Sequence, residues 1–175
     1  WSPRGDAWLY VVGGPGRPDE FWTARTAGGE PSRLLTLTTR GLLWSNPVFS
    51  PDGHRVAWAD ETAIRTLAAA GGRPITVQSA NTVPGLCWSP DGEWIWYSDG
   101  PPPTLRKVPS QGGQPVAVRE SVSTVFDCSP DGRWVSARGR TGLVIVSTDG
   151  KEERGTRGDG GSGRRVGLVR AKGRP

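Results

Sequence analysis

Apolar and polar residues alternate in short runs that recur along the chain. The clearest runs are Trp8–Tyr10, Val56–Trp58, Ile95–Tyr97 and Val135–Ala137. β-Branched and aromatic residues at alternate positions predict strands with one well-buried face. The intervening positions are also largely apolar, which predicts burial on both faces, as in sheets stacked face to face. No stretch has apolar spacing of 3.6 over a helical length, so the pattern predicts an all-β protein.

A tight turn precedes each of these runs. The tetrapeptide Ser-Pro-Asp-Gly occurs at Ser50–Gly53, Ser89–Gly92 and Ser129–Gly132, with an imperfect copy at Ser2–Gly5. Pro fixes φ at the first central position, Asp bonds its own backbone, and Gly accepts a positive φ. The four serines stand 48, 39 and 40 residues apart. A period of this size indicates a repeat architecture.

A second turn signal, Gly-Gly-x-Pro, recurs within the repeat at Gly28–Pro31, Gly71–Pro74 and Gly112–Pro115. A Gly-Gly pair between two short β-prone runs predicts a hairpin. The Pro falls at the start of the outer strand, where a missing N–H is tolerated. Another short apolar run stands before each Ser-Pro. Each unit of about 40 residues therefore predicts four antiparallel strands, the content of a propeller blade.

These residues resemble the TolB-type, WD40-like β-propeller repeat, whose hallmark is an aromatic residue, Ser-Pro-Asp-Gly and a following strand. Phe49–Gly53 and Trp88–Gly92 match it closely, whereas Cys128 and Arg4 depart from it. The family uses this repeat in the periplasmic Tol system, in propellers attached to prolyl-oligopeptidase-like enzymes, and in sensor regions of bacterial Ser/Thr kinases. The resemblance implies a propeller and an extracytoplasmic location, but a fold does not choose among these functions.

The repeat predicts blades at residues 1–40, 41–80, 81–121 and 122–150. Four blades are at the lower limit for a propeller, and the innermost strand expected before Trp1 is missing. Because repeat arrays need capped ends, we expect a partial propeller of about four blades. The parent chain or a second copy would complete it. A small four-bladed ring is the alternative.

The segment 151–175 differs in composition from the repeats. It has eight basic and three acidic residues, which accounts for the whole net charge of +5. We expect a basic, Gly-rich flexible tail or a truncated blade. Because the segment has no aromatic residue for base stacking, nucleic acid is not an expected partner. No apolar run is long enough to cross a membrane, so no membrane insertion is expected.

The two cysteines, Cys87 and Cys128, lie near corresponding places in consecutive units but are offset by one residue relative to the turn. Adjacent residues on a strand point to opposite faces. We therefore expect free thiols that act as small apolar fillers. Two cysteines and one histidine make no zinc ligand set, so neither a metal nor a cofactor is expected.

Candidate catalytic groups are few, and the sequence predicts no enzymatic activity. His54 is the only histidine, and no Gly-x-Ser-x-Gly elbow is present. Gly158–Gly163 has glycines at dinucleotide-binding spacing but lacks the helix and acidic residue that this motif requires. Asp60 and Asp99 stand at equivalent places after their strands, where Asp commonly initiates a turn.

Two Pro-containing loops are the predicted contact surface. Both join the second and third strands of a unit, so they should emerge on one face, and their Pro content lowers the ordering cost of binding. The predicted function is a non-catalytic interaction or scaffold module that binds a protein or ligand. The alternative is the propeller of a prolyl-oligopeptidase-type peptidase or a kinase sensor, with the catalytic domain outside this chain. The predicted contact residues are Gly14, Pro15, Arg17 and Asp19 in the loop 14–20, and Pro101, Pro102 and Pro103 in the other.

Overall fold

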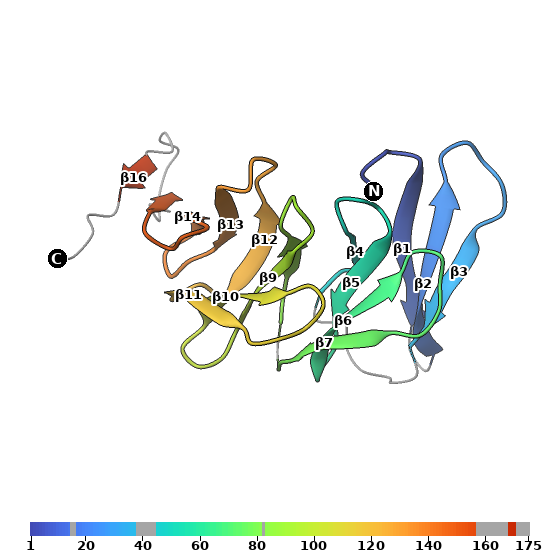
Figure 1. The fold of residues 1–175 in the computed structure, drawn as a ribbon, viewed down its shortest axis with the longest axis horizontal. Helices are drawn as coiled ribbons and strands as arrows, with labels where there is room; N and C mark the ends of the chain where they lie inside the picture. The colour runs from blue at the N-terminus through green and yellow to red at the C-terminus, as the bar shows by residue number, and fades with distance from the viewer. Residues whose placement is uncertain (15–16, 38–44, 82, 157–167, 171–175) are drawn as a thin grey trace.

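The computed structural model describes residues 1–14, 17–37, 45–81, 83–156 and 168–170. All regular structure in these residues is β-strand, and none of it is helical. The strands form four antiparallel sheets that lie side by side in chain order (Figure 1). The all-β architecture predicted from the alternation pattern is confirmed.

The strands follow the repeat closely. Sheet 1 contains β1 (Ala7–Gly14), β2 (Arg17–Arg25) and β3 (Ser32–Thr36). Sheet 2 contains β4 (Val48–Phe49), β5 (Arg55–Ala59), β6 (Ala63–Ala68) and β7 (Ile75–Ser79). Sheet 3 contains β8 (Leu86–Trp88), β9 (Trp94–Asp99), β10 (Thr104–Pro109) and β11 (Val116–Glu120). Sheet 4 contains β12 (Thr124–Cys128), β13 (Trp134–Arg138), β14 (Leu143–Ser147), β15 (Glu153–Thr156) and β16 (Leu168–Arg170).

Sheets 1 and 4 depart from the four-stranded layout of sheets 2 and 3. Strand β1 is equivalent to β5, β9 and β13, and no described strand pairs with its other edge. Strand β15 begins at Glu153 and pairs with β14. Sheet 4 therefore extends past residue 150, into the segment that the sequence assigned to a tail or a truncated blade.

The same hydrogen bonds hold each Ser-Pro-Asp-Gly turn. Ser50 Oγ donates to Asp52 Oδ1 at 2.5 Å and accepts from the Arg55 N–H at 2.9 Å. The Ser89 and Ser129 turns repeat both bonds. The glycines that close the three turns have φ of 73°, 72° and 70°, a region that other residues rarely adopt.

Each sheet turns one kind of face towards the preceding sheet and another towards the following sheet. Phe21 of sheet 1 packs edge-on against Trp58 of sheet 2, with ring centroids 5.2 Å apart. At the next junction Ala57 packs in one cluster with Ile95 and Tyr97. At the third, Trp96 packs in one cluster with Val135 and Ala137. The middle residue of each second strand thus faces the following sheet, and its two neighbours face the preceding one.

Sheet 1 leaves exposed the face that, in sheets 2, 3 and 4, is covered by the preceding sheet. Val56, Ile95 and Val135 are fully buried, whereas the equivalent Trp8 is 48% exposed. Val12 on the same strand is 46% exposed. Trp1 packs against Trp8 with ring centroids 5.5 Å apart. No described sheet precedes sheet 1, which accounts for this apolar face.

The prediction of two free thiols is wrong, because Cys87 and Cys128 form a disulfide with a Cα–Cα distance of 5.8 Å. Cys87 lies opposite Trp96 on the neighbouring strand, and both side chains face sheet 4. Cys128 lies opposite Val135 on the neighbouring strand, and both side chains face sheet 3. Two sheets that pack face to face meet through opposite faces, so the one-residue offset brings the thiols together instead of separating them.

Candidate functional site: a cavity at the connector rim

One edge of the stacked sheets carries the hairpins between second and third strands, together with the segments that lead to the next sheet. We call this edge the connector rim; its described parts include residues 60–62, 79–81, 83–84, 100–103 and 121–123. The opposite edge carries the Ser-Pro-Asp-Gly and Gly-Gly turns, and we call it the turn rim. Both predicted contact loops belong to the connector rim, as expected from their place between second and third strands.

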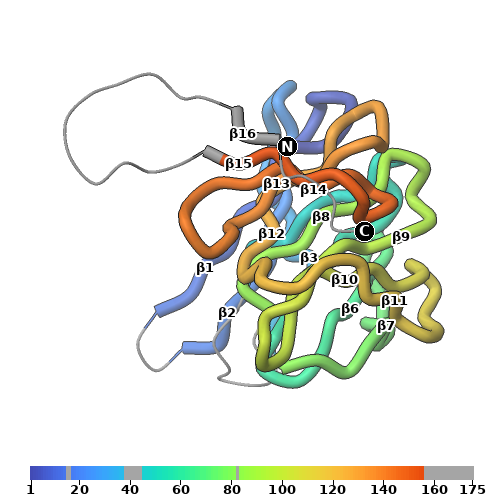
Figure 2. The backbone as a smooth tube through the Cα atoms, turned by 90° about the vertical axis from the view of Figure 1, so that its left-hand side faces the viewer, coloured from blue at the N-terminus to red at the C-terminus, as the bar shows by residue number. Residues whose placement is uncertain are grey.

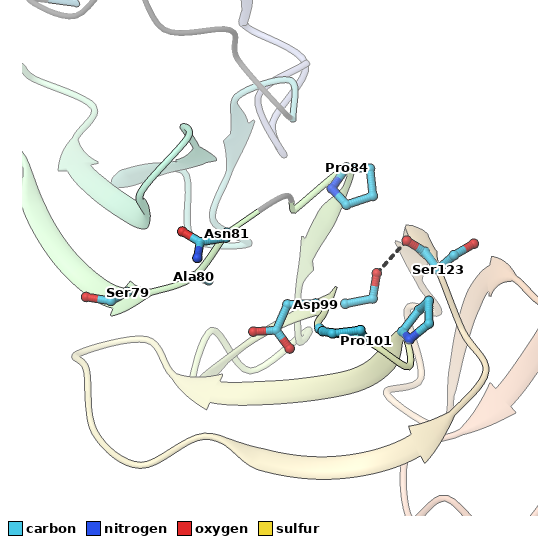
Figure 3. Close-up of a pocket in the computed structure, with 10 residues that line it drawn as sticks. Ser79, Ala80, Asn81, Pro84, Asp99, Pro101 and Ser123 are labelled. Carbon is cyan, nitrogen blue, oxygen red and sulfur yellow. Dashed lines mark hydrogen bonds between the residues drawn. The ribbon is translucent and has the colours of Figure 1, made fainter.

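A cavity of about 620 Å³ opens at the connector rim over sheets 2, 3 and 4 (Figure 3). Its walls come from the segment after β7, the hairpin after β9 and the connection before β12. This volume lies within the range of small-ligand sites. The lining residues are Ser79, Ala80, Asn81, Pro84, Ser98, Asp99, Gly100, Pro101, Pro103 and Ser123.

Asp99 is the only charged residue among those lining residues. Its Oδ1 accepts a hydrogen bond from Arg106 Nε at 2.7 Å, and its side chain is 21% exposed. Buried Ser98 donates its hydroxyl to the Ser123 carbonyl oxygen at 2.7 Å, which ties sheet 3 to the connection before β12. The cavity thus combines one carboxylate and several hydroxyl or amide groups with the apolar faces of three prolines.

Asp60 occupies the same repeat position in sheet 2, but both of its carboxylate oxygens accept hydrogen bonds from neighbouring residues. Its Oδ1 accepts from the N–H groups of Thr62 and Ala63, and its Oδ2 accepts from Arg65 Nε at 2.5 Å. Burial alone would raise the pKa of the Asp60 carboxyl, but the hydrogen bonds from Arg65 and Thr62 outweigh it and lower the pKa. Asp60 therefore closes its own turn, the role predicted from the sequence.

The first predicted contact loop is largely strand. The insertion lengthens β1 and β2 into a hairpin in which Gly14 pairs with Arg17. Figure 2 shows this hairpin reaching beyond the neighbouring strands. A Cβ on Gly13 would overlap the Asp19 carboxylate, so the Asp19 side chain packs against Gly13 of the same hairpin. Pro15 lies outside the described residues.

The second predicted loop forms part of the cavity. Pro101 and Pro103 line it, whereas the Pro102 carbonyl oxygen accepts a hydrogen bond from Thr104 Oγ1. No residue of the β1–β2 hairpin is among the lining residues, so the structure does not join the two loops into one site. Sequence reasoning missed Ser79, Asn81 and Ser123, because they lie on connections that carry no motif.

The remaining sequence predictions concern a dinucleotide-type motif, metal binding and membrane insertion. Gly158–Gly163 lies outside the described residues. Within the described ranges, no three His, Cys, Asp or Glu side chains gather closely enough to hold a metal ion. No helix in that part of the chain could span a membrane.

Comparison with solved structures identifies the architecture. A putative TolB from Agrobacterium tumefaciens is similar with a TM-score of 0.69 and 24% identity, over 87% of this chain and 58% of that one. A structure from a nidogen/laminin complex is similar with a TM-score of 0.69 and 15% identity, over 88% and 62% of the two chains. A prolyl endopeptidase structure is similar with a TM-score of 0.60 and 16% identity, over 97% and 28%.

The chain therefore spans 28% to 62% of the length of these similar structures. Neither a protein-family model nor a curated protein sequence matches it. Identities below 25% carry the fold alone, and function must be argued from the site. The four sheets are consecutive blades of a partial β-propeller, similar to that of TolB.

Proposed function

We propose that this chain is a non-catalytic interaction module that binds a protein partner at the connector rim. The observation that carries the proposal is the 620 Å³ cavity whose wall includes Pro101 and Pro103. One hairpin and two connections between sheets converge there, and such loops on a rigid scaffold commonly carry binding. One of the similar structures comes from a nidogen/laminin complex, which supports a protein partner for this fold.

The cavity favours binding over covalent chemistry. Its described lining residues include serine hydroxyls but no histidine, lysine or cysteine that could activate one. Nucleophilic catalysis needs a base within hydrogen-bond reach of the nucleophile. The buried Ser98 hydroxyl instead donates to a backbone carbonyl oxygen. We therefore expect no hydrolysis of p-nitrophenyl acetate or a Gly-Pro p-nitroanilide.

Selection of peptides tests the binding role. Peptides enriched from a random displayed library on the folded chain should lose most of their affinity for Ser79→Trp, which fills the cavity mouth from the exposed end of β7. The matched control is Arg73→Trp, an exposed position at the turn rim. Peptides that bind both variants as well as the parent chain would contradict the proposal.

The open face of sheet 1 supports a further part of the proposal, that another blade packs there. Three equivalent faces in this chain are each covered by the preceding sheet. Trp8 and Val12 remain exposed at the fourth. The further blade would come from the parent protein or from a second copy.

The second candidate function is the propeller of a prolyl-oligopeptidase-type peptidase. The similarity to a prolyl endopeptidase, over only 28% of that chain, favours it. The coding sequence on either side of this stretch separates the candidates: an α/β-hydrolase pattern with Gly-x-Ser-x-Gly supports the peptidase, and a kinase signature supports a sensor. A secretory signal with neither pattern supports a binding protein.

A further inference from the structure

The Asp99 carboxylate has a hydrogen-bonding environment unlike that of its repeat equivalent, Asp60. In sheet 2, the residues two and three places after Asp60 donate their N–H groups to it. The residues two and three places after Asp99 are Pro101 and Pro102, in a hairpin that is two residues longer, so that Thr104 takes the place of Ala63 in the strand pairing. Proline has no N–H, so Pro101 and Pro102 cannot donate to Asp99 as Thr62 and Ala63 donate to Asp60.

One oxygen of Asp99 is left available. Arg106 Nε occupies Oδ1, and no hydrogen bond within the described residues reaches Oδ2. Arg106 itself does not line the cavity, so a ligand there meets the carboxylate first. In Figure 3 the carboxylate stands between the segment of Ser79 and Asn81 on one side and Pro101 on the other.

The rest of the cavity complements a hydrogen-bond donor carried on an aliphatic chain. Ser98 has already donated its hydrogen to the Ser123 carbonyl oxygen, so its hydroxyl oxygen retains acceptor capacity. Pro84, Pro101 and Pro103 offer apolar surfaces around the carboxylate. Long basic side chains bind in this way, with the stem against apolar surface and the charged head on an acceptor.

We propose that this cavity takes a lysine or arginine side chain of the protein partner, with its ammonium or guanidinium group hydrogen-bonded to the free oxygen of Asp99. This inference rests on the proposed binding function and names the chemistry of its anchor. Neutral side chains can donate only a weaker hydrogen bond to this carboxylate than a charged donor does, and acidic side chains are repelled by it.

Titration of the folded chain with capped amino acids tests the assignment. N-Acetyl-lysine amide and N-acetyl-arginine amide should shift the backbone amide resonances of Ser79, Asn81 and Asp99 in nitrogen–proton correlation spectra. N-Acetyl-norleucine amide, which keeps the aliphatic stem and lacks the charge, should not. Asp99→Asn should weaken binding of the basic probes about tenfold or more, as expected for the loss of a hydrogen bond to a charged group.

Two further variants keep the test interpretable. Ser79→Trp blocks the cavity without altering the Asp99–Arg106 pair and should also abolish the shifts. Glu93→Gln removes the same charge from an exposed residue at the turn rim and should leave binding unchanged. Equal binding of norleucine and lysine probes, or undiminished binding by both cavity variants, would overturn the inference.

Two other results would also overturn it. Tighter binding of free 1,5-diaminopentane than of capped lysine would assign the cavity to a polyamine. Peptides that need the open cavity but carry no basic residue would overturn the basic anchor while leaving the proposed function intact. Peptides that ignore the connector rim would count against the proposed function itself.

Discussion

Cys87 on β8 is bonded to Cys128 on β12, so a covalent link joins the innermost strands of two successive blades. Cys87 is 5% exposed and belongs to the apolar cluster between sheets 3 and 4. Disulfides persist mainly in oxidising compartments. We therefore expect the mature protein outside the reducing cytosol, in agreement with the location that the family resemblance implies.

Reduction of this disulfide should lower the stability of the chain. The bonded residues are separated by 41 positions, and chain entropy alone predicts a loss of about 4 kcal/mol in the free energy of unfolding. Urea unfolding with and without dithiothreitol measures the difference. The double variant Cys87→Ala/Cys128→Ala should be insensitive to the reductant. A parent chain that unfolds at the same urea concentration in both conditions would show that the link contributes nothing.

The turn aspartates should make stability depend on acid pH. Hydrogen bonds from Ser89 and Ser129 are the largest cause that lowers the pKa of the Asp91 and Asp131 carboxyls. Because the folded pKa lies below the ordinary value of 3.8, stability is full above that pH and is lost as the pH falls through the lower, folded value. Urea midpoints at pH 7 and pH 3 should differ less for Asp91→Asn/Asp131→Asn than for the parent. Glu93→Gln, which removes no serine hydrogen bond, is the control.

Gly132→Ala should be destabilising through its backbone. Gly132 has φ of 70° and lies against the ring of Pro90 in the preceding Ser-Pro-Asp-Gly turn. A left-handed conformation costs a non-glycine residue about 1–2 kcal/mol, and chemical denaturation should show a loss of that size. Gly14→Ala is the matched control, because a Cβ there meets no atom within 4 Å. Equal stabilities for the two variants would contradict the backbone argument.

Tyr97→Phe should raise stability or leave it unchanged. The Tyr97 hydroxyl is buried with no hydrogen-bond partner among the described residues, so its removal costs little and recovers up to about 1 kcal/mol of desolvation. A loss above that amount would reveal a hydrogen-bond partner. Tyr10→Phe, at a half-buried site on the open face, controls for the substitution itself.

The same residue should affect alkaline stability. Burial, followed by the nearby Asp99 charge, raises the pKa of Tyr97 from 10.0 to about 12. The unfolded phenol ionises near pH 10.0, whereas the folded phenol ionises only near pH 12. The free energy of unfolding therefore keeps its full value below pH 10.0 and falls as the pH rises from 10.0 through about 12. The parent chain should therefore lose more stability between pH 8 and pH 11 than Tyr97→Phe. Equal losses in urea unfolding at the two pH values would exclude a perturbed phenol.

The chain on its own should self-associate through the open face of sheet 1. Exposed Trp1, Trp8 and Val12 form an apolar surface that other blades bury, and such patches drive association. Sedimentation should show concentration-dependent oligomers for the parent chain and a monomer for Trp8→Lys. Ile75→Lys, which removes an exposed apolar residue on the outer strand of sheet 2, should not have this effect. A soluble parent monomer with cooperative melting would contradict the prediction.

The repeat predicted the strands well because each is bounded by turns with strong local chemistry. The run from Ile95 to Tyr97 lies inside β9, and the Gly-Gly turn after it leads to β11, as expected. Such turns depend on Pro, Asp and Gly at fixed offsets, which the sequence displays directly.

The site was harder to predict, because its residues meet only through the stacking of sheets. Ser79 and Ser123 come from different connections and share no spacing. The disulfide could not be predicted for a related reason: residues offset by one position point to opposite faces of their own sheets, and these two faces meet only when sheet 3 packs on sheet 4. Asp99 did carry a readable signal, however. Prolines stand two and three places after it, where Asp60 has residues that donate their N–H groups, so those two bonds cannot form at Asp99.

The unlike faces of each blade give the array a polarity. The surface that a blade offers to its successor, centred on residues such as Trp96, cannot serve as the surface offered to its predecessor, centred on residues such as Ile95 and Tyr97. Two copies that associate through blade faces must therefore join head to tail, a heterologous contact without two-fold symmetry. Head-to-tail addition of copies ends when the blades close into a ring, so the number of blades in a closed ring sets the number of copies in the assembly.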